Sequence, residues 1–115
     1  MGAFSYSDLF YTDQRGTLNV RANVTLLPET RTVRRSRWRP NHNFGPPEGR
    51  DFYIGQVEFE GSDKLEPGQT CTASVLFLDG PGLSENLVPG GSWRIQEGRA
   101  LVATATVIEV MSEVQ

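Results

Sequence analysis

Near the C-terminal end of the chain, two apolar runs are separated by a short glycine-centred break. Trp93 and Ile95 alternate with polar residues in the first run, and the second run extends from Ala100 to Val110. Between them lies Glu97-Gly98-Arg99. Alternation with a period of two is typical of a half-buried strand, and a glycine-centred reversal between two such runs predicts a β-hairpin. This pattern favours a β-sheet protein.

Three more segments have strand character: residues 18–27, 52–59 and 70–78. Gly55 in the second of these predicts a bulge, because glycine inside a strand often marks one. Residues 29–50 form a long polar connection in which we expect an irregular strand near 37–44, anchored by Trp38 and Phe44. Together with the hairpin, these segments predict an all-β fold, a six-stranded antiparallel β-barrel or sandwich.

The length of 115 residues allows one domain, which we expect to span residues 15–115. Residues 1–14 form an N-terminal extension rich in aromatic residues, which packs over an open end of the barrel or against another subunit. The sequence contains no long apolar run that predicts a membrane partner and no signal peptide. A single cysteine, Cys71, is compatible with a reducing compartment, so a cytoplasmic location is predicted.

Charge is distributed unevenly along the chain. Residues 15–50 hold eight arginines and two glutamates, a net charge of +6, whereas residues 51–115 have a net charge of −7. One interpretation is a surface with a basic side and an acidic side. The other is that charges at alternate strand positions only keep the barrel in solution.

Five arginines and one tryptophan lie close together within residues 31–39. Guanidinium groups bind phosphates and an aromatic ring can stack on an unpaired base, so this cluster is a candidate RNA-binding site. Alternatively, Trp38 packs inward and the arginines pair with acidic residues. The isoelectric point near 5.1 counts against a dedicated nucleic-acid binder. The cluster comprises Arg31, Arg34, Arg35, Arg37, Trp38 and Arg39.

The sequence offers no recognisable arrangement for catalysis. His42 is the only histidine, which excludes metal sites built from several histidines. A dyad of His42 with Cys71 is formally possible, but the inward strand position of Cys71 favours an inert core residue. We therefore predict that the protein is not an enzyme and has no catalytic residues, cofactor, metal site or small-molecule substrate.

Several short motifs in order resemble the C-terminal β-barrel domain (domain 3) of translation elongation factor Tu and its relatives. They run from about residue 19 to residue 110 and end with a Pro-Gly turn, an aromatic-x-Ile strand and a Val- and Ala-rich last strand. The motifs are Val20–Leu27, Arg39-Pro40-Asn41, Gly55–Phe59, Pro67-Gly68, Pro89-Gly90, Trp93-x-Ile95 and Glu97-Gly98-Arg99. The resemblance implies a six-stranded antiparallel barrel.

In that family the domain touches the T-stem backbone of aminoacyl-tRNA, the GTPase domain and the exchange factor. The resemblance implies that Glu97 and Gly98 match a tRNA-contacting Glu-Gly pair and that Asn41 replaces a family glutamine. The family's Arg-Glu-Gly-Gly-Arg turn is here Gln96-Glu97-Gly98-Arg99, which lacks one arginine and one glycine. Neither a GTPase domain nor a second barrel domain is recognised, so delivery of aminoacyl-tRNA by this chain alone is not expected.

These observations predict a non-catalytic binding module whose partner is an unknown protein, such as a component of the translation machinery or a competitor for its interfaces. The alternative is an RNA-binding module that contacts a tRNA-like stem through the Arg-rich loop. The candidate contact residues are Arg31, Arg34, Arg35, Arg37, Trp38, Arg39, Asn41, Glu97, Gly98 and Arg99.

Overall fold

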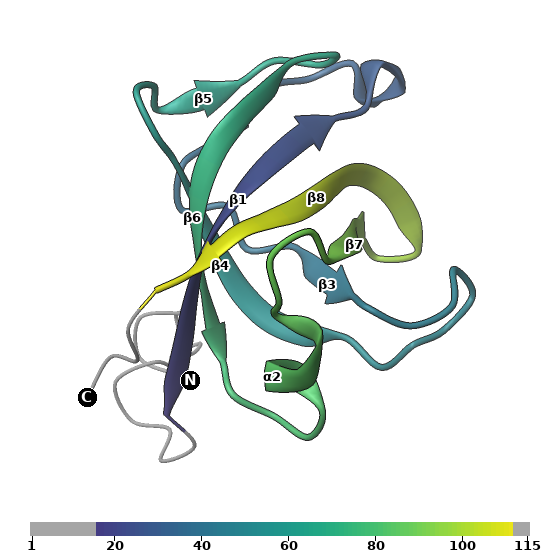
Figure 1. The fold of residues 1–115 in the computed structure, drawn as a ribbon. Helices are drawn as coiled ribbons and strands as arrows, with labels where there is room; N and C mark the ends of the chain where they lie inside the picture. The colour runs from purple at the N-terminus through teal and green to yellow at the C-terminus, as the bar shows by residue number, and fades with distance from the viewer. Residues whose placement is uncertain (1–15, 112–115) are drawn as a thin grey trace, which may run out of the picture.

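The computed structural model describes residues 16–111. The predicted extension of residues 1–14 lies outside this range. Apart from two short helical turns, the regular elements are strands (Figure 1). In chain order they are β1 (Thr17–Leu26), the 3-10 helix η1 (Pro28–Thr30), β2 (Arg34–Arg35), β3 (Asn41–Asn43), β4 (Tyr53–Phe59), β5 (Lys64–Leu65), β6 (Thr70–Leu78), α2 (Leu83–Asn86), β7 (Ser92–Glu97) and β8 (Ala100–Val110).

Six of the strands close into an antiparallel barrel in the order β1-β6-β4-β3-β7-β8, as predicted. The first and last strands of the barrel pair with each other, which removes the exposed edges of an open sheet. The short strands β2 and β5 form a separate two-stranded sheet. Among the helices that the structure describes, none is long and apolar enough to cross a membrane.

The predicted hairpin is present between β7 and β8. Glu97 pairs with Ala100, which leaves Gly98 and Arg99 as a two-residue loop. Gly98 has φ of 60°, a left-handed conformation that costs a residue with a side chain about 1–2 kcal/mol. The glycine therefore permits the tight reversal that positions Glu97 at the mouth of the loop.

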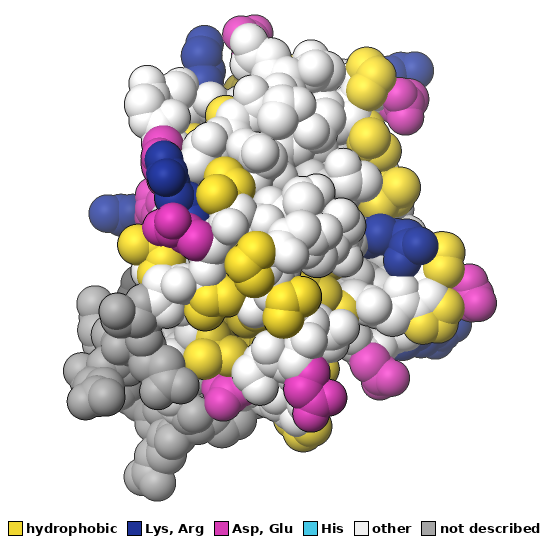
Figure 2. Space-filling model, viewed as in Figure 1, with side chains coloured by type: hydrophobic (Ala, Val, Ile, Leu, Met, Phe, Trp, Pro, Cys, Tyr) yellow, Lys and Arg dark blue, Asp and Glu magenta, His cyan; other side chains and the backbone are white. Residues whose placement is uncertain are grey.

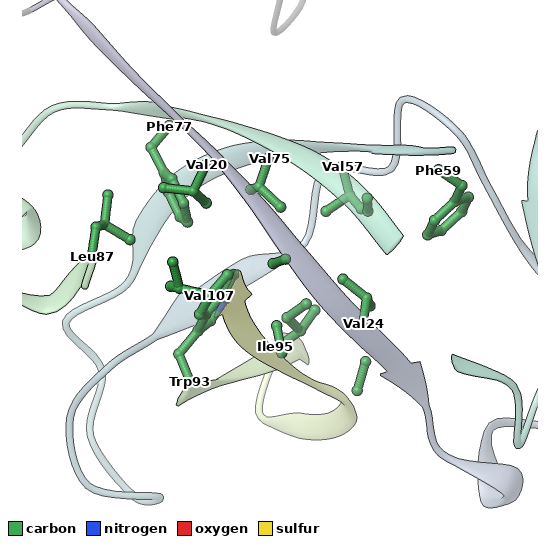
Figure 3. Close-up of a cluster of buried hydrophobic side chains, with 14 of the residues drawn as sticks. Val20, Val24, Val57, Phe59, Val75, Phe77, Leu87, Trp93, Ile95 and Val107 are labelled. Atoms are coloured by element: carbon green, nitrogen blue, oxygen red, sulfur yellow. The ribbon is translucent and has the colours of Figure 1, made fainter. Parts of the chain in front are cut away.

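Apolar side chains at alternate strand positions point inward and fill the barrel. In β1, residues 18, 20, 22, 24 and 26 are buried while the intervening positions are at least partly exposed, as the sequence predicts. Valines meet aromatic rings in the centre, where Val20 lies beside Phe77 and Val107 lies beside Trp93 (Figure 3). The ring centroids of Phe77 and Trp93 are 5.8 Å apart. Burying each such side chain contributes about 1.5–3 kcal/mol, so this interior is the main source of stability.

One prediction about a single residue is wrong. The β4–β6 ladder runs without a register shift from Gly55 to Phe59, so Gly55 marks no bulge. Instead, its missing side chain leaves room for the ring of His42, which would lie 2.8 Å from an added Cβ. Cys71 lies on the inward side of β6 but is only partly buried, near the end of the strand, and it packs against the core from there.

The long connection of residues 29–50 contains regular elements and contacts other strands of the barrel. It contains η1, β2 and β3, and Trp38 forms an isolated bridge with Val57. Trp38 and Phe44 both pack against the core, which confirms their predicted role as anchors. The irregular strand expected near 37–44 corresponds to this bridge followed by β3.

Candidate interaction surface

The carboxylate of Glu97 lies at the centre of a polar cluster that joins the Arg-rich loop to the β7–β8 hairpin. It accepts hydrogen bonds from Nε and Nη2 of Arg34, at 2.7 and 2.8 Å, and from the indole Nε1 of Trp38 at 2.8 Å. A bidentate pair of this kind is among the stronger polar contacts in proteins. We call Arg34, Trp38 and Glu97 the Glu97 cluster.

The electrostatics of the cluster follow from this geometry. The hydrogen bonds from Arg34, with a further contribution from Trp38, hold the pKa of the Glu97 carboxyl below its usual value. The guanidinium carbon of Arg34 also lies 5.8 Å from the centre of the Trp38 ring, within cation–π range. Glu97 is therefore ionised near neutral pH, and its charge offsets that of Arg34.

Arg34 has no side-chain nitrogen left over for a ligand in this conformation. Its Nη1 donates to the hydroxyl and the carbonyl oxygen of Thr32, at 2.7 and 2.8 Å. The side chain is only 14% exposed. Of the predicted contact residues, Arg34 and Trp38 thus hold the loop onto the hairpin, and the indole ring packs inward as one of the two interpretations expected.

Arg35 and Arg37 differ from Arg34 because they face solvent. Their side chains are 67% and 79% exposed, and their nearest carboxylates, on Asp63 and Glu58, are 3.8 and 4.0 Å away. Arg37 has φ of 72°, and its left-handed conformation turns the chain from β2 toward the Trp38 bridge. Both guanidinium groups are therefore accessible to a partner.

The remaining predicted residues flank the same surface. Asn41 pairs with Gln96 in the sheet and donates from Nδ2 to the carbonyl oxygen of Gly98 at 3.4 Å. Arg39 donates from Nε to Gln56 at 3.0 Å on the neighbouring strand. Arg31 and Arg99 are exposed. The structure therefore brings Asn41 to the Glu97-Gly98 hairpin, although Asn41 and Gly98 are 57 positions apart in the sequence.

A small pocket of about 250 Å³ opens beside the hairpin loop. Gln96 forms part of its wall, and its amide is 3% exposed because Asn43 donates to its Oε1 and Arg99 accepts from its Nε2. Sequence reasoning missed this buried Asn–Gln pair, since both residues occupy positions that face out of the barrel. The pocket is lined by Pro47, Glu48, Gly49, Arg50, Gln96 and Arg99.

The basic and acidic halves of the sequence interleave on the folded surface. Each ion pair that the structure describes joins an arginine from residues 15–50 to an acid from residues 51–115. Arg21, for example, makes a bidentate contact with Glu60. Figure 2 shows basic and acidic side chains next to one another on the visible face. This arrangement agrees with the interpretation in which the arginines pair with the acidic half.

His42 belongs to the barrel interior. Its Nδ1 accepts from the indole Nε1 of Trp93 at 3.0 Å, and its Nε2 lies 3.0 Å from the carbonyl oxygen of Gly55. Burial lowers the pKa of His42 to about 4. Burial also raises the pKa of the Cys71 thiol, which opposes thiolate formation. Both ring nitrogens of His42 are occupied, so it has no free nitrogen with which to activate a thiol.

The fold and surface define a closed antiparallel β-barrel with a polar interaction surface that combines one loop and one hairpin. The chain matches no model of a known protein family, and no curated protein is significantly similar to it.

Proposed function

We propose that this protein is a non-catalytic binding module that recognises a protein partner through the surface formed by residues 31–50 and the Glu97–Arg99 loop. The observation that carries the proposal is the Glu97 cluster, because it binds the Arg-rich loop to the hairpin and neutralises the charge of Arg34. A surface of mixed charge next to a small pocket suits a protein better than a polyanion.

The resemblance to the C-terminal barrel of elongation factor Tu supports the choice of partner class. In that family the matching domain contacts both RNA and protein, and here its tRNA-contacting turn lacks one arginine. We therefore propose a component of the translation machinery, or a competitor for its interfaces, as the partner. A cytoplasmic location is part of this proposal.

Site-specific photo-crosslinking in native lysate tests the proposal. A photoreactive residue would replace Arg37 or Arg99, and a control would carry it at Asn23, an exposed position on β1. In the strand order, β1 lies three positions from β3, so Asn23 is on the far side of the barrel. We expect the same stoichiometric protein adduct from positions 37 and 99, unchanged by nuclease treatment. Equal labelling from all three positions would contradict the proposal.

The second candidate function is RNA binding, which the exposure of Arg35 and Arg37 favours. Their carboxylate partners lie at the outer limit of an ion pair, so a phosphate could displace them at little cost. In the same experiment, nuclease-sensitive recovery of a structured RNA would support this candidate. The protein-binding proposal would then be abandoned, since the adduct would be an RNA.

A further inference from the structure

A pocket with mainly apolar walls lies on the outer face of the barrel, where Ile54 of β4 is the sheet neighbour of Asn41. Its volume is about 430 Å³, within the range of about 300–1,000 Å³ found for ligand pockets. It lies where β4 begins and β6 ends. Its walls are formed by Asp51, Phe52, Tyr53, Ile54, Leu78, Asp79, Gly80 and Pro81.

Leu78 is a buried apolar residue on the outer face of the barrel. Phe77 faces the barrel interior, so alternation directs Leu78 outward, and Leu78 is not part of the barrel's core cluster. It is nevertheless only 2% exposed. Continuing the β4–β6 register beyond Gly55 and Phe77 places Ile54 opposite Leu78. Two apolar side chains therefore form an outward-facing pair at this end of the sheet.

The described chain begins directly beside the pocket. Thr17 pairs with Leu78, and the carbonyl oxygen of Gly16 accepts a hydrogen bond from the backbone N–H of Asp79 at 3.1 Å. Residues 1–15 therefore join the barrel at the pocket's edge. Tyr11 is five positions before Gly16, a reach of about 17 Å when the chain is extended. The pocket is within range of residues 9–11.

The composition of the N-terminal segment is complementary to an apolar pocket. Its aromatic and aliphatic side chains are concentrated in residues 4–11, namely Phe4, Tyr6, Leu9, Phe10 and Tyr11. A short tether raises the effective concentration of such a segment to about the millimolar range. Few favourable contacts are then needed for this segment to occupy the pocket. A free peptide at lower concentration would need a higher affinity to displace it.

A buried polar atom on the outer side of β1, two positions along the strand from Thr17, also lacks a partner. Asn19 lies on the outer side of β1, opposite Leu76, and its Oδ1 is buried without a hydrogen-bond donor among the described residues. Buried polar atoms nearly always have such a donor. A chain lying across this face would supply one from a backbone N–H or a tyrosine hydroxyl.

We infer that the N-terminal segment of this same chain docks into the Ile54–Leu78 pocket, with Leu9, Phe10 and Tyr11 supplying the buried side chains. The contact is intramolecular and adjoins the proposed partner surface, because Ile54 pairs with Asn41 in the sheet. It corresponds to the role in which residues 1–14 pack on the barrel rather than against another subunit.

Methyl NMR on the full chain tests the inference, because the protein contains only three isoleucines. Ile54 lies in the pocket, Ile95 in the core and Ile108 on the exposed side of β8. The resonance of each δ1-methyl therefore reports on the surroundings of a different part of the barrel. We expect nuclear Overhauser contacts from the Ile54 methyl to the ring of Phe10 or Tyr11. The double variant Phe10→Ser/Tyr11→Ser should remove them and displace the Ile54 resonance alone.

Two controls make the outcome decisive. Ser7→Ala changes the same segment without removing an apolar group and should leave all three methyl resonances in place. Ile54→Val removes one resonance and thereby assigns it. An unmoved Ile54 methyl in the double variant would overturn the inference, as would a displacement of Ile108 instead. Contacts that disappear on dilution would also overturn it, because they would come from a second copy of the chain.

Discussion

The indole of Trp93 donates its N–H to Nδ1 of His42 across the barrel interior, at 3.0 Å. Because Nδ1 accepts this bond, the neutral ring carries its proton on Nε2, which donates to the carbonyl oxygen of Gly55. Both polar atoms of a fully buried imidazole are thereby satisfied. The arrangement requires a neutral ring, since a second proton on Nδ1 would meet the indole N–H.

Stability should therefore fall on mild acidification. The unfolded chain protonates His42 near pH 6.5, whereas the folded barrel does so only near pH 4. Between these values the unfolded state binds more protons, so the free energy of unfolding decreases as the pH falls and this contribution levels off below about 4. At about 1.4 kcal/mol per pH unit, the loss amounts to about 3 kcal/mol. Urea unfolding at several pH values measures it.

The matched variant for this prediction is His42→Gln, which keeps a polar side chain but does not titrate. We expect it to be less stable at pH 7 and to show a shallower dependence on pH between 4 and 6.5. An unchanged slope in this variant would assign the acid sensitivity to carboxylates instead.

Gly55→Ala should destabilise the barrel because the rings of His42 and Phe77 fill the space beside Gly55. A new Cβ would lie 2.8 Å from Nε2 of His42 and 3.0 Å from Cδ1 of Phe77. Neither buried ring can retreat, and such overpacking costs about 1–3 kcal/mol. Gly45→Ala is the control, since its nearest neighbour would be 3.5 Å away. Equal unfolding free energies for the two variants would contradict this explanation.

Local sequence signals were sufficient for the barrel but not for its polar interior. The alternation in β1 and the Gly98 break depend on a few neighbouring residues, so both could be predicted. The burial of His42 depends on Trp93 and Gly55, which come from two other strands. Gly55 was mistaken for a bulge because its role is to accommodate a ring that lies thirteen residues away in sequence.

For the candidate surface too, the sequence predicts which residues are involved but not which of them face solvent. The list of arginines followed from their density in residues 31–39, but which of them face solvent depends on acids supplied by β4, β7 and the residue before β5. Arg34 is held by Glu97, which lies sixty-three positions away, whereas its neighbour Arg35 points into solvent. Residues adjacent in the sequence therefore have different roles, and only the closure of the barrel distinguishes them.

Removing the charge of Glu97 should weaken the attachment of the Arg-rich loop. Glu97→Gln keeps an acceptor for Trp38 but loses the bidentate ionic pair with Arg34. Glu97 is 39% exposed, and solvent screening limits the expected loss to about 1 kcal/mol. A double-mutant cycle with Arg34→Met isolates the pair, and a coupling energy near zero would contradict the prediction.

The same pair should add to the sensitivity to acid, in a lower range of pH than His42. Arg34 and Trp38 depress the pKa of Glu97 in the folded state relative to 4.5. The stabilisation is therefore fully present above the unfolded-state value and is lost as the pH falls through the lower folded-state value. The difference in unfolding free energy between the wild-type chain and Glu97→Gln, followed from pH 6 downward, should diminish accordingly.

Arg35→Ala/Arg37→Ala should separate binding from folding. Both side chains are largely exposed and their ion pairs are long, so the double variant should unfold within about 0.5 kcal/mol of the wild type. Partner capture should nevertheless weaken, because these are the accessible cations of the proposed surface. Arg21→Ala is the matched control, since it breaks an ion pair on β1 and should leave capture unchanged.

The salt dependence of the remaining interaction then distinguishes the two partner classes. If phosphates are bound, each lost arginine contact should reduce the slope of log affinity against log salt by about one. A protein partner should show a shallower slope that the double variant hardly alters, because its affinity comes mainly from contacts other than counterion release. If Arg21→Ala weakens capture as much as the double variant does, the partner surface does not lie on this loop.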